Sequence, residues 1–222
     1  MGGGETVEHR DLKELAIAWA RAGGFELCGR EIRLPASNFR ADVAACRKPA
    51  PGTADPGETA VFECKRSRAD LCKDSRQEAA TREQLIALQS RQRELEALLS
   101  RHLPNLRHGD TLFPEYDSLD LEGFRHETIR KVRREVEALS HGLHGGTKFD
   151  RIVRYRCVDF CYLVLTRGLE SDYGPPHGWG VLVTEGSGLR LERRPVRLEA
   201  GPVRRLALLV SIARRAAAAR PG

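Results

Sequence analysis

The stretch TAVFECKRSRADL, residues 59–71, decides how the rest of this sequence is interpreted. It opens with an apolar run at residues 60–62 that is typical of a buried strand. The run leads directly into Glu63 and Lys65, which are two positions apart and therefore project from the same face of a strand. Either the strand runs out into solvent here, or the two charges are placed on one face for chemistry.

The Glu-x-Lys pattern has little weight alone. The chain contains six lysines, at positions 13, 48, 65, 73, 131 and 148, and 31 acidic residues. About one acid-x-Lys triplet is therefore expected by chance. A second copy does exist, at residues 11–13, inside a stretch with helical apolar spacing, where we expect its charges on a solvated helix face. Context separates the copies, because only Glu63 and Lys65 end an apolar strand.

An isolated acid, Asp42, interrupts the preceding apolar stretch RADVAA at residues 40–45. Burying a carboxylate is costly unless it is paired or bound to a cation. A hairpin joining residues 39–47 to 59–65 would place Asp42 beside Glu63. Two adjacent carboxylates repel one another unless a metal ion or a proton intervenes. The sequence therefore predicts a special site shared by these two strands.

Hydrophobic spacing and turn residues divide the chain into an ordered series of elements. The order is a helix at 8–22, strands at 25–35, 39–47 and 59–65, a long charged helix from about 70 to Pro104, a helix within 121–143, a helix at 147–159, strands at 160–166, 180–185 and 189–194, and a final helix from 202. Without residues 75–145, the remainder is predicted to be a mixed α/β sheet flanked by helices.

The middle of the chain has the spacing of two helical seams. They consist of Leu85, Leu88, Gln92, Leu95 and Leu99, and of Ile129, Val132, Val136, Leu139 and Leu143. Two such seams joined by a loop predict an antiparallel coiled-coil hairpin. Each helix needs the other, or a partner chain, to bury its stripe.

Composition narrows the class of protein without deciding it. A chain of 222 residues suits one large domain or a core with an insertion, and a net charge of +6 permits a polyanionic partner without requiring one. The preference for arginine over lysine is typical of a GC-rich bacterial genome. Six cysteines without a CxxC pair favour reduced thiols over a zinc site. With no membrane-spanning run or signal sequence, we expect a cytoplasmic protein that does not contact membranes.

The spacing D-x20-E-x-K, across two adjacent strands flanked by helices, resembles the PD-(D/E)XK nuclease superfamily. The segments EIRLPASNFRADVAA, VFECKRSRADLCKD, CVDFCYLVL and PPHGWGVLVTEGSGLRLERRP look most like its MmcB-like, DNA-repair-associated branch. Four departures stand out: Ala41 replaces the name-giving proline, Arg66 displaces Ser67, Val158 stands where the branch often has cysteine, and residues 75–145 are inserted.

The resemblance implies a restriction-endonuclease-like mixed β-sheet flanked by helices, with an inserted antiparallel coiled-coil helical hairpin. The nuclease-like core would comprise residues 1–74 and 146–222, and the hairpin would comprise 75–145. The implied activity is metal-dependent phosphodiester hydrolysis, with DNA a better candidate than RNA. Residues 75–145 would add substrate contacts, a protein partner or self-association.

The resemblance also implies a role for individual residues. Asp42 and Glu63 would bind Mg²⁺ or Mn²⁺, helped by the carbonyl of Cys64, since hard oxygen ligands suit these ions. Lys65 would orient the attacking water and stabilise charge on the phosphate. The supporting candidates are Glu14, Glu31, Lys148 and Tyr155. A solvated helix position is the better explanation of Glu14, whereas ordinary surface explains Lys148 and Tyr155 equally well.

The alternative is a non-catalytic protein. The same fold would then serve as a DNA-binding or assembly subunit that acts through the coiled-coil hairpin. Retention of Asp42, Glu63 and Lys65 together favours the enzyme, because a purely structural descendant need not keep all three.

Overall fold

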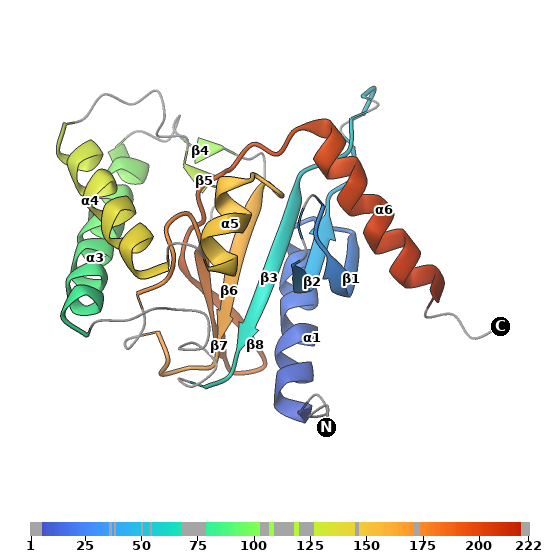
Figure 1. Cartoon of the computed structure of the whole chain (residues 1–222), viewed down its shortest axis with the longest axis horizontal. Helices are drawn as coiled ribbons and strands as arrows, with labels where there is room; N and C mark the ends of the chain where they lie inside the picture. Colours follow the sequence, from blue (N-terminus) through green and yellow to red (C-terminus); the bar gives the residue numbers. More distant parts are fainter. Residues whose placement is uncertain are drawn as a thin grey trace.

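A computed structural model of the chain describes residues 6–35, 37, 39–49, 51–53, 55–67, 79–102, 107–108, 118–119, 127–144, 147–170 and 174–218. Within these ranges, five helices flank a six-stranded mixed sheet, so the predicted α/β class is confirmed (Figure 1). The helices are α1 (Val7–Ala22), α3 (Ala79–His102), α4 (Glu127–His144), α5 (Lys148–Arg154) and α6 (Pro202–Ala218). The strands of the large sheet are β1 (Leu27–Arg33), β2 (Arg40–Cys46), β3 (Thr59–Lys65), β6 (Phe160–Leu165), β7 (Gly180–Glu185) and β8 (Gly188–Arg193).

The strand order is β1-β2-β3-β6-β7-β8. The first three strands form an antiparallel meander, β3, β6 and β7 run parallel, and β8 closes the far edge antiparallel to β7. The central strands β3 and β6 are buried almost throughout, as expected for parallel strands covered on both faces. The strand that carries Glu63 therefore lies in the middle of the sheet.

Helices cover both faces of this sheet (Figure 1). The helix α1 packs its apolar side, including Leu12, Ala16 and Trp19, on one face, where Trp19 contacts Tyr162 at a ring distance of 5.1 Å. The other face is covered by α5 and α6, through residues such as Phe149 and Leu208. The sheet and its flanking helices thus form the layered core that the periodicity predicts.

A buried acid, Asp159, ties the starts of β3 and β6 together. Its carboxylate accepts two hydrogen bonds from Arg205 of α6, at 3.0 and 2.7 Å. It also accepts the backbone N–H and the hydroxyl of Thr59, at 2.8 and 2.9 Å, and the backbone N–H of Ala200, at 3.0 Å. Asp159 is fully buried, and these donors satisfy a charge that would otherwise be expensive to bury.

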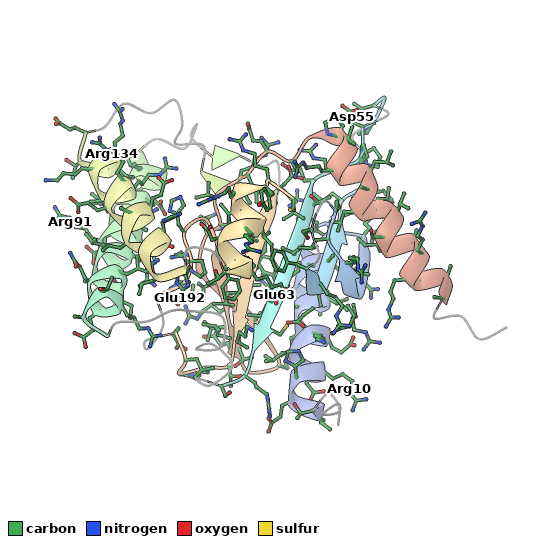
Figure 2. The ribbon with its side chains drawn as sticks, viewed as in Figure 1. Arg10, Asp55, Glu63, Arg91, Arg134 and Glu192 are labelled. Atoms are coloured by element: carbon green, nitrogen blue, oxygen red, sulfur yellow. The ribbon has the colours of Figure 1, made fainter. Side chains whose placement is uncertain are left out.

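The helices α3 and α4 pack against each other beside the sheet (Figure 1). Their shared cluster contains Leu85, Val132, Val136 and Leu143, with Leu88, Leu95 and Leu139 partly buried against it, so seven residues of the predicted seams meet. Two bonds fasten α3 to the core: Arg93 to Glu192 of β8 at 2.6 Å, and Gln89 to the carbonyl of Pro175 at 2.7 Å. Figure 2 shows Glu192 on the side that faces this pair of helices.

The junction between α4 and the core encloses a cavity of about 180 Å³. It is lined by Glu137, Ser140, His141, His144, Asp150, Val153, Arg154, Pro176 and His177. The backbone N–H of His177 donates to the Ser140 hydroxyl at 2.5 Å. Burial lowers the pKa of His177 to about 4, an effect that Arg193 and Arg133 reinforce and Glu137 opposes.

Two details differ from the sequence-based expectations, and a third expectation falls outside the described residues. The helix predicted at 147–159 ends at Arg154, because the chain turns at Arg156, whose φ of 46° is incompatible with a right-handed helix. The expected loop after α3 contains two short paired strands, β4 (Arg107–His108) and β5 (Ser118–Leu119). The beginning of the long helix predicted from residue 70 lies outside the described residues, which resume at 79.

The cysteines and helices give two further results. Five of the six cysteines fall within the described ranges and all five are free thiols, of which four are buried and Cys28 is intermediate. Among the described helices, none combines the length and the apolar character that a bilayer crossing requires.

Candidate functional site

The site lies where two strands of the sheet part. The last residue pair between β2 and β3 is Val43 with Phe62, and the next positions along the two strands are Asp42 and Glu63. Directly opposite residues of an antiparallel pair have Cβ atoms about 5 Å apart. At this point the Asp42 carboxylate accepts the backbone N–H of Cys64 at 2.8 Å. The predicted neighbourhood of Asp42 and Glu63 is therefore present, at a fork in the sheet.

Glu63 is a buried carboxylate in the middle of the molecule, beside α5 (Figure 2). Its Oε1 accepts a hydrogen bond from Lys148 Nζ at 2.6 Å, and the same ammonium donates to the carbonyl of Arg40 at 2.6 Å. Burial raises the pKa of Glu63 to about 7, and nearby Asp42 raises it further, while Lys148 and Lys65 oppose the shift. At neutral pH this carboxyl is poised between its two charge states.

Asp42 is more accessible, with 18% of its side chain exposed. One oxygen, Oδ2, holds the Cys64 N–H. The other, Oδ1, lies 3.4 Å from His9 Nε2 and 3.6 Å from Lys13 Nζ, both on α1. These distances exceed those of a normal N–H···O bond, so Oδ1 retains capacity for a further ligand.

A third acid belongs to the same row across the sheet. The pairs Arg30 with Val43 and Ile32 with Ala41 flank Glu31, which therefore lies opposite Asp42. Glu31 has a φ of 56°, a left-handed conformation that is unusual for a residue other than glycine. Strained backbone of this kind clusters at functional sites. The row Glu31, Asp42 and Glu63 thus spans three adjacent strands.

Lys65 lies on the same side of β3 as Glu63. Its Nζ is 5.8 Å from the centre of the Phe149 ring, and Phe149 follows Lys148 at the start of α5. Lys65 and Lys148 therefore both contribute positive charge to the face of the sheet on which Glu63 lies. The structure brings together four of the predicted residues: Asp42, Glu63, Lys65 and Lys148.

Two predicted supporting residues lie elsewhere. Glu14 is exposed and pairs with Arg30 at 2.6 Å on the surface, as the alternative of a solvated position anticipates. Tyr155 caps the end of α5 opposite to Lys148 and is 48% exposed. Seven residues of helix separate them by about 10 Å along the axis. The Cys64 thiol is buried in the core on the α1 side, and burial raises its pKa, so only its backbone reaches the site.

Sequence reasoning missed Lys13, His9 and Arg40. The expectation that residues 11–13 lie on a solvated face is wrong for Lys13, which is only 2% exposed. Its Nζ pairs with Glu31 Oε1, and Arg40 Nε binds Glu31 Oε2 at 2.6 Å. Lys13 could have been found, because it lies three and seven positions before Ala16 and Ala20 and thus on their buried side of the helix.

The acids at the fork suit a hard divalent cation. Mg²⁺ is typically bound by one or two carboxylates together with substrate phosphates and water, and Asp42 with Glu63 supply two. The raised pKa of Glu63 shows a carboxylate that a divalent charge would stabilise. Within the described ranges, no three or more His, Cys, Asp or Glu side chains converge as a metal-binding group. The carboxylate oxygens of Asp42 and Glu63 are of the ligand type that a hard divalent ion takes, together with water and substrate oxygens.

Comparisons with known proteins leave the chain without an assigned family. No protein-family model and no curated protein matches it. Among solved structures, it resembles a protein of unknown function from Silicibacter pomeroyi, with a TM-score of 0.48 and 18% sequence identity. The likeness covers 97% of this chain and 90% of that one. At this level it carries no argument about function.

Proposed function

We propose that this protein is a metal-dependent nuclease of the PD-(D/E)XK type that hydrolyses phosphodiester bonds in DNA, in a repair-associated role. The observation that carries the proposal is the position of Asp42 and Glu63, which lie opposite each other where β2 and β3 stop pairing, with Lys65 two residues beyond Glu63. In this proposal the mixed sheet is a restriction-endonuclease-like fold, and α3 and α4 form an inserted coiled-coil hairpin.

Asp42 Oδ1 and the Glu63 carboxylate would hold Mg²⁺ or Mn²⁺, with the Cys64 carbonyl as a further candidate ligand. When bound, such an ion polarises the scissile phosphate and lowers the pKa of a bound water. The hydrogen bond from Cys64 N–H to Asp42 Oδ2 fixes the direction in which Oδ1 points. That bond makes Asp42 a preorganised ligand.

The lysines supply positive charge where a phosphate would arrive. Lys65 would orient the attacking water and stabilise negative charge that develops on the phosphate oxygens. Lys148 holds Glu63 by an ion pair while no substrate is bound, and it is 19% exposed, so it can reach a phosphate when the pair opens. The compact ammonium of lysine suits both tasks.

The decisive experiment is a cleavage assay with Mg²⁺ or Mn²⁺ on single-stranded, duplex and branched DNA, with RNA in parallel. We expect Lys65→Ala to lower the cleavage rate about 100-fold, because charge stabilisation of this kind is typically worth that much. Lys48→Ala is the matched control, since Lys48 is an exposed lysine that pairs with Glu26 at 2.7 Å. Absence of cleavage on every substrate, or equal rates for Lys65→Ala and the native chain, would refute the proposal.

One observation favours the alternative of a non-catalytic subunit. Lys148 and Lys13 already neutralise Glu63 and Glu31, so a cation is built into the site from the chain itself. Such a protein would bind DNA or assemble with a partner through α3 and α4. It would bind DNA without cutting it, and with affinity unchanged by Lys65→Ala.

A further inference from the structure

Glu31, the third acid of the row, is paired with cations and is therefore not available to act together with Asp42 and Glu63. Both of its oxygens are engaged by cations: Oε1 by Lys13 Nζ and Oε2 by Arg40 Nε at 2.6 Å. Lys13 reaches Asp42 Oδ1 only at 3.6 Å. The strong bonds of Lys13 and Arg40 therefore go to Glu31, while Asp42 Oδ1 has longer contacts, at 3.4 Å with His9 and 3.6 Å with Lys13.

Because Lys13 is buried, its ion pair with Glu31 is difficult to break. Its side chain is 3% exposed, and a desolvated ammonium costs several kcal/mol unless it is paired. Among the described acids, Glu31 and Asp42 lie within 4 Å of its ammonium, and both favour the charged form of Lys13. Arg40, by contrast, is 69% exposed, and its pairing with Glu31 is worth little by itself.

We propose that Lys13 is a positioning residue that holds Glu31 away from the metal and limits the protein ligands to Asp42 and Glu63. This inference rests on the metal site of the proposed function. A two-carboxylate site leaves coordination positions for substrate phosphate and water, as Mg²⁺ chemistry requires. A three-carboxylate site would bind divalent ions more tightly but leave fewer positions for substrate.

Replacing Lys13 by an uncharged side chain of similar length reverses the arrangement. In Lys13→Met, Glu31 loses its buried partner while it still lies opposite Asp42 on the neighbouring strand. Two facing carboxylates without a cation repel each other and attract a divalent ion. We expect Lys13→Met to bind Mn²⁺ at least about tenfold more tightly than the native chain, since ligand charge count sets such affinities.

The test is calorimetric titration of Mn²⁺ into the whole native chain, Lys13→Met, Glu31→Gln and the double variant Lys13→Met/Glu31→Gln. In the double variant we expect the gain in affinity to vanish, because the carboxylate that Lys13→Met releases is gone. Glu31→Gln alone should not raise the affinity, because it removes the acid that Lys13→Met releases and leaves Asp42 as the carboxylate within reach of Lys13. Lys48→Met, which removes an exposed lysine, controls for the loss of one positive charge.

Three results would overturn the inference: no gain in Lys13→Met, a gain that persists in the double variant, or a tenfold gain in Glu31→Gln. The last result applies even where Lys13→Met does not fold. This experiment tests the role of Lys13 separately from the proposed nuclease activity. A native chain that neither binds Mn²⁺ nor cuts DNA refutes the nuclease, whereas the difference between Lys13→Met and the double variant judges the role of Lys13 in either case.

Discussion

Asp159 and Glu63 are both buried acids, but they differ in the hydrogen-bond donors that surround them. Asp159 accepts hydrogen bonds from Arg205, Thr59 and Ala200, which occupy its carboxylate oxygens at the start of β6. Glu63 accepts a hydrogen bond from Lys148, and burial raises its pKa to about 7. A satisfied acid stabilises a fold, whereas an acid with a raised pKa is available for proton or metal chemistry.

This contrast leads to a prediction for Asp159. Asp159→Ala should lower the free energy of unfolding by about 3–5 kcal/mol, because it leaves the Arg205 guanidinium without its buried partner. Urea titration followed by tryptophan fluorescence measures the change. Glu14→Ala removes an exposed acid paired with Arg30 and should cost less than about 1 kcal/mol. Similar losses for the two variants would contradict a structural role for Asp159.

At the residue scale, the sequence predicted the contacts that follow from chain-local rules. Asp42 and Glu63 meet because two short strands joined by an exposed connection form an antiparallel pair, and Lys65 shares a face with Glu63 by alternation. The contacts of Lys13 and His9 with the acids depend on how α1 is laid across the sheet. Periodicity places Lys13 on the buried side of α1, but no local rule specifies that packing angle, so the acids that Lys13 and His9 contact could not be derived.

At the scale of the element, α6 shows how a correctly predicted helix divides its surface. Leu208 is fully buried against the sheet, while Leu206, two positions earlier, is 52% exposed. Leu208→Ala should destabilise the protein by about 2–5 kcal/mol through loss of buried contacts and the cavity left behind. Leu206→Ala should change stability by less than about 0.5 kcal/mol. Chemical unfolding of the pair checks this, and a reversed order would show that the packing of α6 is wrong.

The junction of α4 with the core should be sensitive to acid through His177. Unfolded His177 takes up a proton as the pH falls through about 6.5, whereas its folded pKa is about 4. The stabilisation is therefore complete above pH 6.5 and is lost as the pH falls towards 4. Linkage gives a loss of about 2 kcal/mol between about pH 7.5 and pH 5.

Urea unfolding of the native chain and of His177→Gln at both pH values isolates this effect. The comparison is needed because Glu63 acts in the opposite sense: its raised pKa lowers stability as the pH rises from about 4.5 to 7. We expect the difference between the two proteins to narrow at the lower pH. A difference that stays constant would show that His177 takes up its proton equally in both states.

The elements that the sequence misjudged are short. A helix of seven residues, α5, has too few turns for periodicity to locate its end, and the turn at Arg156 has no glycine to signal it. The strands β4 and β5 are two residues each, below the length at which alternation can be recognised. Long periodic segments such as α1 and α6 were predicted within one residue at their described starts.

At the scale of the whole molecule, the order of elements predicted the class of the fold but not the arrangement of the sheet. Hydrophobic patterns predicted a mixed sheet flanked by helices, and this is confirmed. That β3 pairs with β6, in parallel and across the insertion, depends on contacts between residues far apart in sequence. Such pairings depend on the packing of the whole molecule, so local patterns in a single sequence do not predict them.

The pairing of β3 with β6 has a consequence for the chain during its synthesis. Thr59 and Asp159, which close this pairing, are separated by 100 positions. A ribosome that adds about 5–20 residues per second needs about 5–20 seconds to cover that interval. During this interval, α1 and the first three strands can assemble. The backbone groups along the free edge of β3 stay unpaired until β6 has been synthesised. Exposed strand edges invite aggregation, so the order of synthesis leaves the nascent chain open to this hazard until β6 has been made.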